Sequence, residues 1–221
     1  MLGKTVISRY DPKRGELYES SFEYCFSEGM SVLDVLRVIR RDADPTLSFS
    51  ASCRNGKCGL CALEVDGIPC LACDTPAKPE MHIAPLSRLP KLFDLMLDRV
   101  SASEKLNRLR PYLIRSTEAE IPETVILGNQ LGAFEQGREC IECLCCMDVC
   151  PILRKKNETF AGPMVFVRMA RFLFDPRDDF DRKEQLKQNG LYDCISCSLC
   201  SKVCPMGIDP AGLITKLKEN I

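Results

Sequence analysis

The hydrophobic pattern divides the chain near residue 100 into two parts with different periodicities. The first part contains short runs rich in β-branched and aromatic residues, which are typical of strands. Two such runs, 5–10 and 17–26, flank the turn-forming residues 11–15 and predict an antiparallel hairpin. The second part shows the three- and four-residue spacing of amphipathic helices. We therefore expect a small mixed α/β domain over 1–100 and a helical domain over 101–221.

A helix is predicted after the first hairpin. Ser31 suits an N-cap, and Asp34 stands three residues later, where an acidic side chain completes a capping box. The apolar positions behind this cap share helical spacing and form one stripe: Val32, Val35, Leu36 and Ile39. The pair Asp44-Pro45 ends the helix, because the residue before a proline disfavours helical backbone.

A second hairpin is predicted where two apolar runs, 62–65 and 68–71, flank the turn dipeptide Asp66-Gly67. Its second strand leads directly to Cys73 and folds back toward a Gly-containing loop over 53–61. We therefore expect Cys73 to lie close to that loop.

In the second part, the clearest helices cover 164–174 and the C-terminal segment. The first ends at Asp175-Pro176, and the second opens with Asp209-Pro210, an N-cap followed by a first-turn proline. We interpret their apolar stripes as core-packing faces: Val165, Met169, Phe172 and Leu173, and then Leu213, Ile214 and Leu217. Residues 86–100 are expected to connect the two parts.

Composition narrows the class of protein. The 221 residues suit one large domain or two small ones, and no apolar run approaches the roughly 20 residues that span a bilayer. The N-terminus lacks the apolar core of a signal peptide, so we expect a cytoplasmic protein that reaches a membrane only through partner subunits. A formal net charge of −1 does not favour nucleic acid as a partner.

The cysteines change this picture, because twelve of the fifteen fall into three ligand patterns. Two segments read C-x2-C-x2-C-x3-C-P, and we call them the first and second Cys boxes: Cys140, Cys143, Cys146 and Cys150, and then Cys194, Cys197, Cys200 and Cys204. Upstream, Cys53, Cys58 and Cys61 read C-x4-C-x2-C. Cys73 is the candidate fourth ligand there, with Cys70 as the alternative. These spacings are typical of iron–sulfur ligation.

Disulfides and structural zinc explain the pattern less well. Disulfides suit small secreted chains, and no export signal is visible here. Zinc also binds C-x2-C pairs, but zinc does not explain a proline after each fourth cysteine. His82 is the one histidine, so mixed Cys/His zinc sites are nearly excluded, and we expect His82 to be structural.

The spacings also suggest which residues share a cluster. Gly56 and Gly59 let the upstream loop approach a cluster closely and direct N–H groups at sulfur. In paired boxes the fourth cysteine usually ligates the other cluster. We therefore assign Cys140, Cys143, Cys146 and Cys204 to one 4Fe–4S cluster, and Cys194, Cys197, Cys200 and Cys150 to another. The alternative is that each box uses its own four cysteines.

Three cysteines are left over, and by default they are small buried apolar side chains: Cys25, Cys70 and Cys145. Cys145 adjoins Cys146 and could exchange roles with it. The sequence shows no Ser/His/Asp set, no Rossmann or P-loop glycine pattern and no catalytic constellation. We therefore expect substrate chemistry to belong to a partner chain.

The sequence resembles the iron–sulfur subunit of the succinate dehydrogenase and fumarate reductase family over nearly its whole length. The resemblance rests on the helix at 31–36, the segments 44–49 and 52–61, Leu71-Ala72-Cys73, Asp175-Pro176-Arg177-Asp178 and 204–210. It implies an α+β fold, with an N-terminal plant-ferredoxin-like β-grasp domain and a C-terminal all-helical bacterial-ferredoxin-like domain. It also favours Cys73 over Cys70 and implies a partner subunit that carries FAD.

Two departures from that family concern the last cluster. Familiar members hold a 3Fe–4S cluster there because a non-cysteine residue stands at the position of Cys197. With Cys197 present, we expect one 2Fe–2S and two 4Fe–4S clusters, with 3Fe–4S as the alternative for the third. The family's quinone site uses a Trp and a His, whereas this chain has no Trp and carries Ile195 at the His position.

With these two departures, the sequence resembles the iron–sulfur subunits of the thiol- or methylmenaquinol-linked fumarate reductases. In those complexes, a third, cysteine-rich subunit or a membrane anchor exchanges electrons with the iron–sulfur subunit. Our prediction is an electron-transfer subunit of such an oxidoreductase complex. The rival predictions are a soluble ferredoxin-like carrier and a heterodisulfide-reductase-type subunit. An iron–sulfur sensor is disfavoured because no DNA-binding element is visible.

Overall fold

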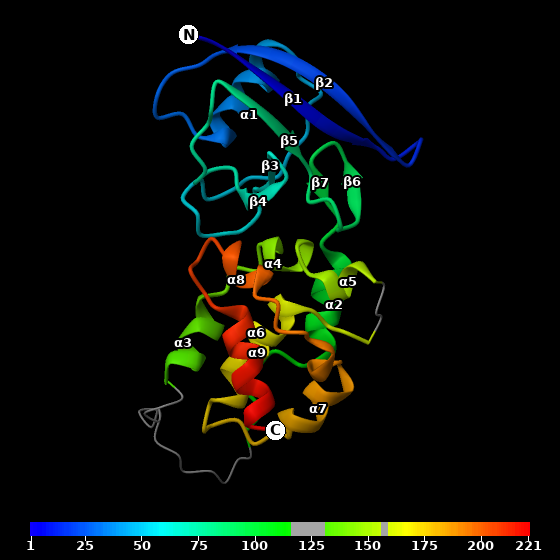
Figure 1. Cartoon of the computed structure of the whole chain (residues 1–221), viewed down its shortest axis with the longest axis vertical. Coiled ribbons are helices and arrows are strands. Elements are labelled where there is room, and N and C mark those ends of the chain that lie inside the picture. Colours follow the sequence, from blue (N-terminus) through cyan, green and yellow to red (C-terminus); the bar gives the residue numbers. More distant parts are fainter. Residues whose placement is uncertain (116–130, 156–158) are drawn as a thin grey trace. The chain divides into compact units, whose positions relative to one another are not determined.

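The computed structural model describes residues 1–115, 131–155 and 159–221, which form two compact units (Figure 1). Unit 1 comprises Met1–Arg99 together with Ile141–Asp148, and unit 2 comprises Val100–Cys140 together with Val149–Ile221. The middle of the first Cys box therefore packs with unit 1, although it follows much of unit 2 in the chain. The hydrophobic pattern of the sequence did not predict that residues 141–148 pack with unit 1.

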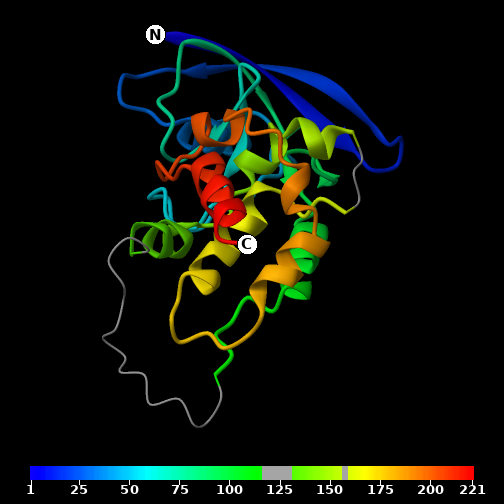
Figure 2. The same cartoon turned by 60° about the horizontal axis from the view of Figure 1, so that its bottom comes forward.

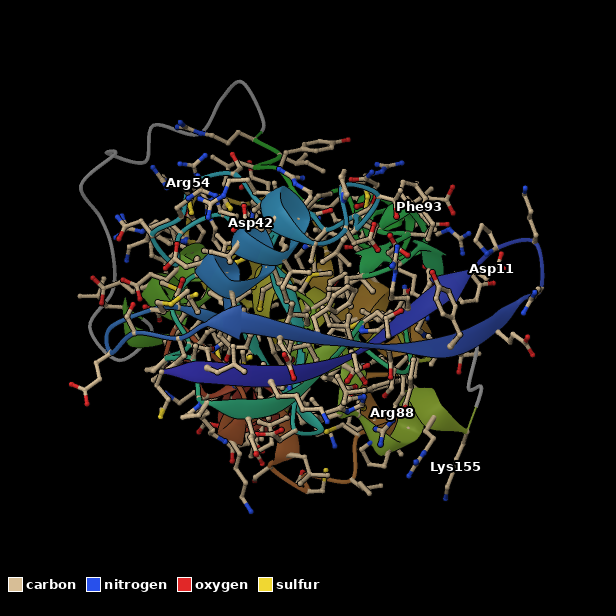
Figure 3. The ribbon with its side chains drawn as sticks, turned by 90° about the horizontal axis from the view of Figure 1, so that it is seen from above. Asp11, Asp42, Arg54, Arg88, Phe93 and Lys155 are labelled. Atoms are coloured by element: carbon tan, nitrogen blue, oxygen red, sulfur yellow. The ribbon has the colours of Figure 1, made fainter. Side chains whose placement is uncertain are left out.

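Unit 1 is built on a five-stranded mixed sheet with the strand order β2-β1-β5-β3-β4. Both predicted hairpins are confirmed, and β5 joins them by pairing parallel to β1 and antiparallel to β3. Figure 3 looks onto the long β1–β2 ribbon, with Asp11 near its turn. The strands are β1 (Leu2–Asp11), β2 (Glu16–Cys25), β3 (Ala62–Val65), β4 (Ile68–Leu71) and β5 (Glu80–Ala84).

Helix α1 (Val32–Asp42) begins as the sequence predicts. The Ser31 hydroxyl accepts a hydrogen bond from the Asp34 N–H at 3.2 Å, and the Asp34 carboxylate accepts one from the Ser31 N–H at 3.0 Å. The Ser31 hydroxyl also donates to the Asp34 carboxylate at 2.7 Å, and this hydrogen bond, followed by the one from the Ser31 N–H, holds the pKa of Asp34 below its usual value. The predicted apolar stripe is buried, together with Leu33, and it forms the core of the unit.

The segment 86–100 is more than a connector, because it contains a small hairpin of β6 (Lys91–Phe93) and β7 (Met96–Leu97). Asp94 lies between these strands and forms an ion pair of 2.8 Å with the buried side chain of Arg9. Arg9 also binds Asp44 at 2.5 Å, and Asp94 accepts a 2.8 Å hydrogen bond from the Ser48 N–H. This network anchors the start of the segment that leads into the Cys53 loop.

Unit 2 is helical, and α6 is its central element. Nearly every side chain of α6 is buried, because α2, α3, α7 and α9 all pack on it. Figures 1 and 2 both show α9 alongside α6. The helices of this unit are α2 (Val100–Arg108), α3 (Leu131–Glu139), α5 (Pro151–Arg154), α6 (Pro163–Leu173), α7 (Arg182–Gln188), α8 (Leu199–Lys202) and α9 (Pro210–Glu219).

The two predicted helices are confirmed as α6 and α9. Asp209 caps α9 by accepting a 3.0 Å hydrogen bond from the Gly212 N–H, and Pro210 occupies the first helical position. The mixed sheet and the helical unit confirm the predicted α+β class. In the described parts of the chain, no helix combines the length and apolar character needed to cross a bilayer.

A buried ion pair organises unit 2. The side chains of Arg182 and Asp178 are each only 1% exposed, and their closest nitrogen and oxygen atoms lie 2.7 Å apart. The remaining guanidinium protons satisfy three backbone carbonyls, those of Leu109, Arg110 and Tyr112. Removing one partner of such a pair leaves a buried charge without compensation, which is strongly destabilising.

We therefore expect Arg182→Met to lower the free energy of unfolding by about 3–5 kcal/mol. Lys183→Met is the matched control, because Lys183 is exposed on the same helix and should change stability by less than about 0.5 kcal/mol. Anaerobic thermal unfolding of the cluster-loaded protein, followed by circular dichroism, measures both. Equal midpoints for the two variants would contradict an organising role for this pair.

Candidate iron–sulfur centres

The Cys53 loop and the β3–β4 hairpin bring four cysteines of unit 1 together. The Sγ atoms of Cys61 and Cys73 lie 3.4 Å apart, and the thiol of Cys58 hydrogen-bonds that of Cys53. Two thiolates on one tetrahedral metal with bonds of about 2.3 Å lie roughly 3.8 Å apart. The arrangement therefore suits two irons, each held by one pair of thiolates.

Backbone N–H groups of this loop point at sulfur, as the sequence predicts. Gly56 N–H donates to Cys73 Sγ at 3.2 Å. The Asn55 and Lys57 N–H groups donate to Cys53 Sγ at 3.4 and 3.3 Å, and they lower the pKa of Cys53 to about 7. Donors that stabilise a thiolate also stabilise the negative charge of a reduced cluster.

The four cysteines differ in their exposure to solvent. Cys53 is exposed, whereas Cys61 is buried, and burial raises the pKa of Cys61 to about 12. A thiol of this kind stays protonated until a metal displaces its proton. Arg54, which directly follows Cys53, is also exposed (Figure 3).

Cys70 has a different environment from Cys73. It lies in β4, and burial raises the pKa of its thiol. Its neighbour Pro69 is paired with Glu64 of β3, so this part of the strand belongs to the sheet rather than to the loop. The geometry therefore supports Cys73 as the fourth residue of the set.

In unit 2, one cavity brings Cys150 of the first Cys box to three cysteines of the second, Cys194, Cys197 and Cys200. Burial raises the pKa of the Cys150 thiol, and it raises that of Cys200 to about 11. Apolar side chains that can exclude water line the same cavity: Ile152, Phe160, Pro163 and Ala211. This set matches the exchange of the fourth cysteine that the paired boxes predict.

Hydrogen bonds from α9 hold the second Cys box in place. Lys218 Nζ donates to the Cys194 carbonyl at 2.7 Å. The Ser201 hydroxyl donates to Asp209 at 2.5 Å and accepts from the Ala211 N–H at 3.1 Å. These contacts join both ends of the box to the helix that packs on α6.

The two boxes share an unusual backbone conformation, which supports the internal repeat. In each box, the residues before and after the second cysteine have positive φ: Glu142 and Leu144, and Ser196 and Ser198, with values of 53°, 74°, 53° and 59°. None is glycine, so each conformation costs about 1–3 kcal/mol and persists only because its surroundings enforce it. Such turns form concave nests of N–H groups that bind anionic centres, including iron–sulfur clusters.

The remaining predicted set is divided between the units. Cys143 and Cys146 belong to unit 1, whereas Cys140 and Cys204 belong to unit 2. In unit 1, the buried Cys145 thiol hydrogen-bonds Cys143 and lowers the pKa of Cys143 to about 7. The same hydrogen bond, together with burial, raises the pKa of Cys145. Cys145 is thus a neighbour of a predicted ligand rather than an isolated core residue.

Three charged residues that the sequence analysis did not single out hold the first Cys box in unit 1. Asp148 accepts a 2.8 Å hydrogen bond from the Arg88 N–H, and Glu64, which accepts one from the Ser87 N–H at 2.8 Å, hydrogen-bonds Asp148. Burial raises the pKa of Asp148 to about 7. The Arg99 side chain binds the backbone carbonyls of Gly59 and Glu142. No motif marks these residues.

Two other sequence predictions concern residues outside the sets. His82 lies in β5, and its Nε2 shares a 2.9 Å hydrogen bond with the Ser8 hydroxyl, in keeping with a structural role. Cys25 is exposed at the end of β2 and so departs from the expectation of a buried side chain. Among the described residues, no three potential ligands converge on a single metal ion. Cys150, Cys194, Cys197 and Cys200 instead line a cavity, as ligands that bind different irons of one cluster do.

Two domain families match the chain in the order of these centres. The 2Fe–2S iron–sulfur cluster binding domain matches residues 4–104, and the 4Fe–4S dicluster domain matches residues 136–208. The chain therefore contains iron–sulfur binding domains of both kinds.

Two curated relatives are similar over almost all of this chain. An uncharacterized iron–sulfur protein of Methanocaldococcus jannaschii is 34% identical, over 93% of this chain and 41% of the relative. A subunit of the fumarate reductase (CoM/CoB) of Methanothermobacter marburgensis is 33% identical, over 96% of this chain and 43% of the relative. The chain thus spans less than half the length of these relatives.

Among solved structures, a chain of the Mycobacterium smegmatis Sdh1 complex in the apo form matches with a TM-score of 0.87 and 30% identity. The match covers 99% of this chain and 94% of that one. Since this similarity extends across both cluster-binding domains, and a fumarate reductase subunit is similar over 96% of this chain, the chain belongs to the iron–sulfur subunits of the succinate dehydrogenase and fumarate reductase family.

Proposed function

We propose that this chain is the electron-transfer subunit of a fumarate reductase or succinate dehydrogenase type complex. It relays single electrons between a partner subunit that carries FAD and a second partner that is a cysteine-rich subunit, a thiol or a membrane component. The observation that carries this proposal is the occurrence of a four-cysteine 2Fe–2S loop and a cavity lined by four cysteines from both Cys boxes in one chain. When bound, the clusters supply one-electron chemistry.

The same geometry supports two of the proposed ligand sets, and the remaining set rests on the spacing of the two Cys boxes. Cys53, Cys58, Cys61 and Cys73 hold a 2Fe–2S cluster, and Cys150, Cys194, Cys197 and Cys200 hold a 4Fe–4S cluster. The middle 4Fe–4S cluster takes the remaining members of the two boxes, Cys140, Cys143, Cys146 and Cys204. Substrate chemistry belongs to the FAD subunit, and the chain reaches a membrane only through its partners.

The third set consists of Cys150, Cys194, Cys197 and Cys200, and its surroundings favour a redox partner other than a quinone. Ile195 lines the cavity and is 62% exposed, yet its side chain cannot donate a hydrogen bond to a quinone oxygen. Cys197 is also exposed, so a redox partner can approach this cluster directly. A fourth thiolate adds negative charge, which lowers the cluster potential and suits a thiol or cysteine-rich partner. The CoM/CoB fumarate reductase relative agrees with this choice.

Replacing one exposed ligand tests the third set. We expect Cys197→Ser to convert the third cluster to a three-iron form or to lose it, because a serine oxygen is a poorer ligand for this iron than a thiolate. Iron content should fall from about ten per chain, the sum of two, four and four. The 2Fe–2S signal in electron paramagnetic resonance (EPR) should not change.

Cys25→Ser is the matched control, because Cys25 is an exposed cysteine outside all three sets. It should leave iron content and every EPR signal at wild-type values. A three-iron signal already present in anaerobically prepared wild-type protein would show that Cys197 is not a ligand.

Purification of the native complex tests the function itself. We expect a flavoprotein to copurify in fixed proportion, and we expect the complex to exchange electrons with low-potential dyes or thiols faster than with quinols. Quinols should be poor electron donors because the quinone they form binds weakly here. A buried quinone carbonyl that receives no hydrogen bond lowers the binding free energy by about 1–3 kcal/mol.

Two results would refute parts of this proposal. A chain that purifies alone and serves several enzymes would be a soluble ferredoxin-like carrier. Rapid quinol-driven fumarate reduction, blocked by an inhibitor bound near Ile195, would restore a quinone-linked function.

A further inference from the structure

The 2Fe–2S loop and the first Cys box are in direct backbone contact within unit 1. Gly59 lies between Cys58 and Cys61, and a Cβ atom added to it would lie 2.6 Å from the Ile141 carbonyl oxygen. The same atom would lie 2.9 Å from Cα and 3.0 Å from Cβ of Cys143. Contacts this short do not occur for real Cβ atoms, so any side chain at this position would force the loops apart.

Arg99 joins the same two loops from the side. Its Nη1 donates to the Gly59 carbonyl at 3.3 Å, and its Nη2 donates to the Glu142 carbonyl. Gly59 directly follows Cys58, and Glu142 directly precedes Cys143. One planar guanidinium therefore clamps the backbone beside a predicted ligand of each cluster, a geometry that its fixed fork of donors makes possible.

The guanidinium also places a positive charge near both sets of thiols. Burial lowers the pKa of Arg99, while Cys143 and Glu142, followed by Cys145 and Cys58, act in the opposite direction. An arginine side chain nonetheless stays protonated in proteins. A reduced cluster carries one more negative charge than an oxidised one, so a fixed positive charge nearby raises its reduction potential. Partial burial weakens the screening of this charge by salt.

We propose that Arg99 is a positioning residue for electron transfer between the 2Fe–2S cluster and the middle 4Fe–4S cluster. With Gly59, its guanidinium holds the two cluster loops at their closest approach, and its charge raises the reduction potentials of both clusters. Closest approach matters because the rate of electron tunnelling falls exponentially with distance. This inference rests on the ligand sets proposed above.

The charge is tested with Arg99→Gln and Arg99→Lys in the intact complex. Gln keeps hydrogen-bond donors without the charge, and Lys keeps the charge without the planar fork. We expect Arg99→Gln to lower both potentials by about 59 mV, the equivalent of a tenfold change in a one-electron equilibrium. In Arg99→Lys, both reduction potentials should stay close to their wild-type values. Redox titration followed by EPR measures each cluster separately.

The control for these variants is Arg14→Gln, because Arg14 is an exposed arginine in the β1–β2 turn of the same unit. It should leave both potentials unchanged. A purely structural Arg99 would make the Gln and Lys variants shift alike, and that result, or wild-type potentials in Arg99→Gln, would refute the electrostatic role. If Arg99→Gln does not retain its clusters, wild-type potentials in Arg99→Lys support the proposal and lowered potentials refute it.

The close approach is tested with Gly59→Ala, which inserts a methyl group between the loops. We expect the magnetic interaction between the two reduced clusters to weaken and the rate of electron transfer between them to fall. Gly67→Ala is the matched control. Gly67 has φ of +77°, close to the +69° of Gly59, but an added Cβ would meet no atom within 4 Å. It therefore reproduces the backbone strain without separating the loops.

An unchanged magnetic interaction in Gly59→Ala, or an equal loss in Gly67→Ala, would overturn the positioning role. Iron content and the cluster signals of the wild-type and Cys197→Ser complexes test the proposed clusters and their ligands by themselves. Only variants with wild-type iron content enter the comparison of potentials and magnetic coupling. A wrong assignment of the ligand sets is thus distinguishable from a wrong assignment of the positioning role of Arg99.

Discussion

A cluster can bridge thiolates from distant parts of the chain only in a fold that holds them at fixed mutual positions, so folding and cluster binding support each other. Cys73 reaches the Cys53 loop only because the β3–β4 hairpin folds back, and Cys150 reaches the second box only because α9 and α6 hold that box against it. The sheet of unit 1 and the helices around α6 are the scaffolds that place these two groups of cysteines. Their cores position sulfur as much as they stabilise the fold.

Negative charge is the second demand that this chemistry makes on the chain. Thiolates and reduced clusters are negatively charged, and the chain stabilises this charge mainly with backbone N–H groups rather than with many basic side chains. The loop at 55–57 aims its N–H groups at sulfur, and both boxes contain positive-φ residues of the kind found in N–H nests. Arg99 is an exception, since it is a full charge placed beside two predicted ligands.

Much of the fold could be predicted from local signals. The Ser31–Asp34 capping box, the Asp66-Gly67 turn and the Asp209-Pro210 helix start are short-range chemistry, and each is found where the sequence places it. Strand β5 was not predicted, because a central strand is defined by its neighbours β1 and β3 rather than by its own sequence. The hairpin of β6 and β7 was missed for a similar reason, since its Asp94 gains its role only by meeting Arg9.

The candidate sites show the same division. The spacing of the cysteines determined the type of chemistry, since ligand gaps of two and four residues are a local property of a loop that wraps a cluster. Tertiary structure decided that the middle of the first Cys box, Ile141–Asp148, belongs to unit 1, where it packs against Gly59, Arg99 and Glu64. These residues carry no motif, because their role depends on backbone approach and buried charge between segments more than forty residues apart in the chain. The sequence by itself therefore determined that the chain carries iron–sulfur domains and predicted which cysteines bind iron, whereas only the packing of the chain decided which loops meet and which charges lie beside them.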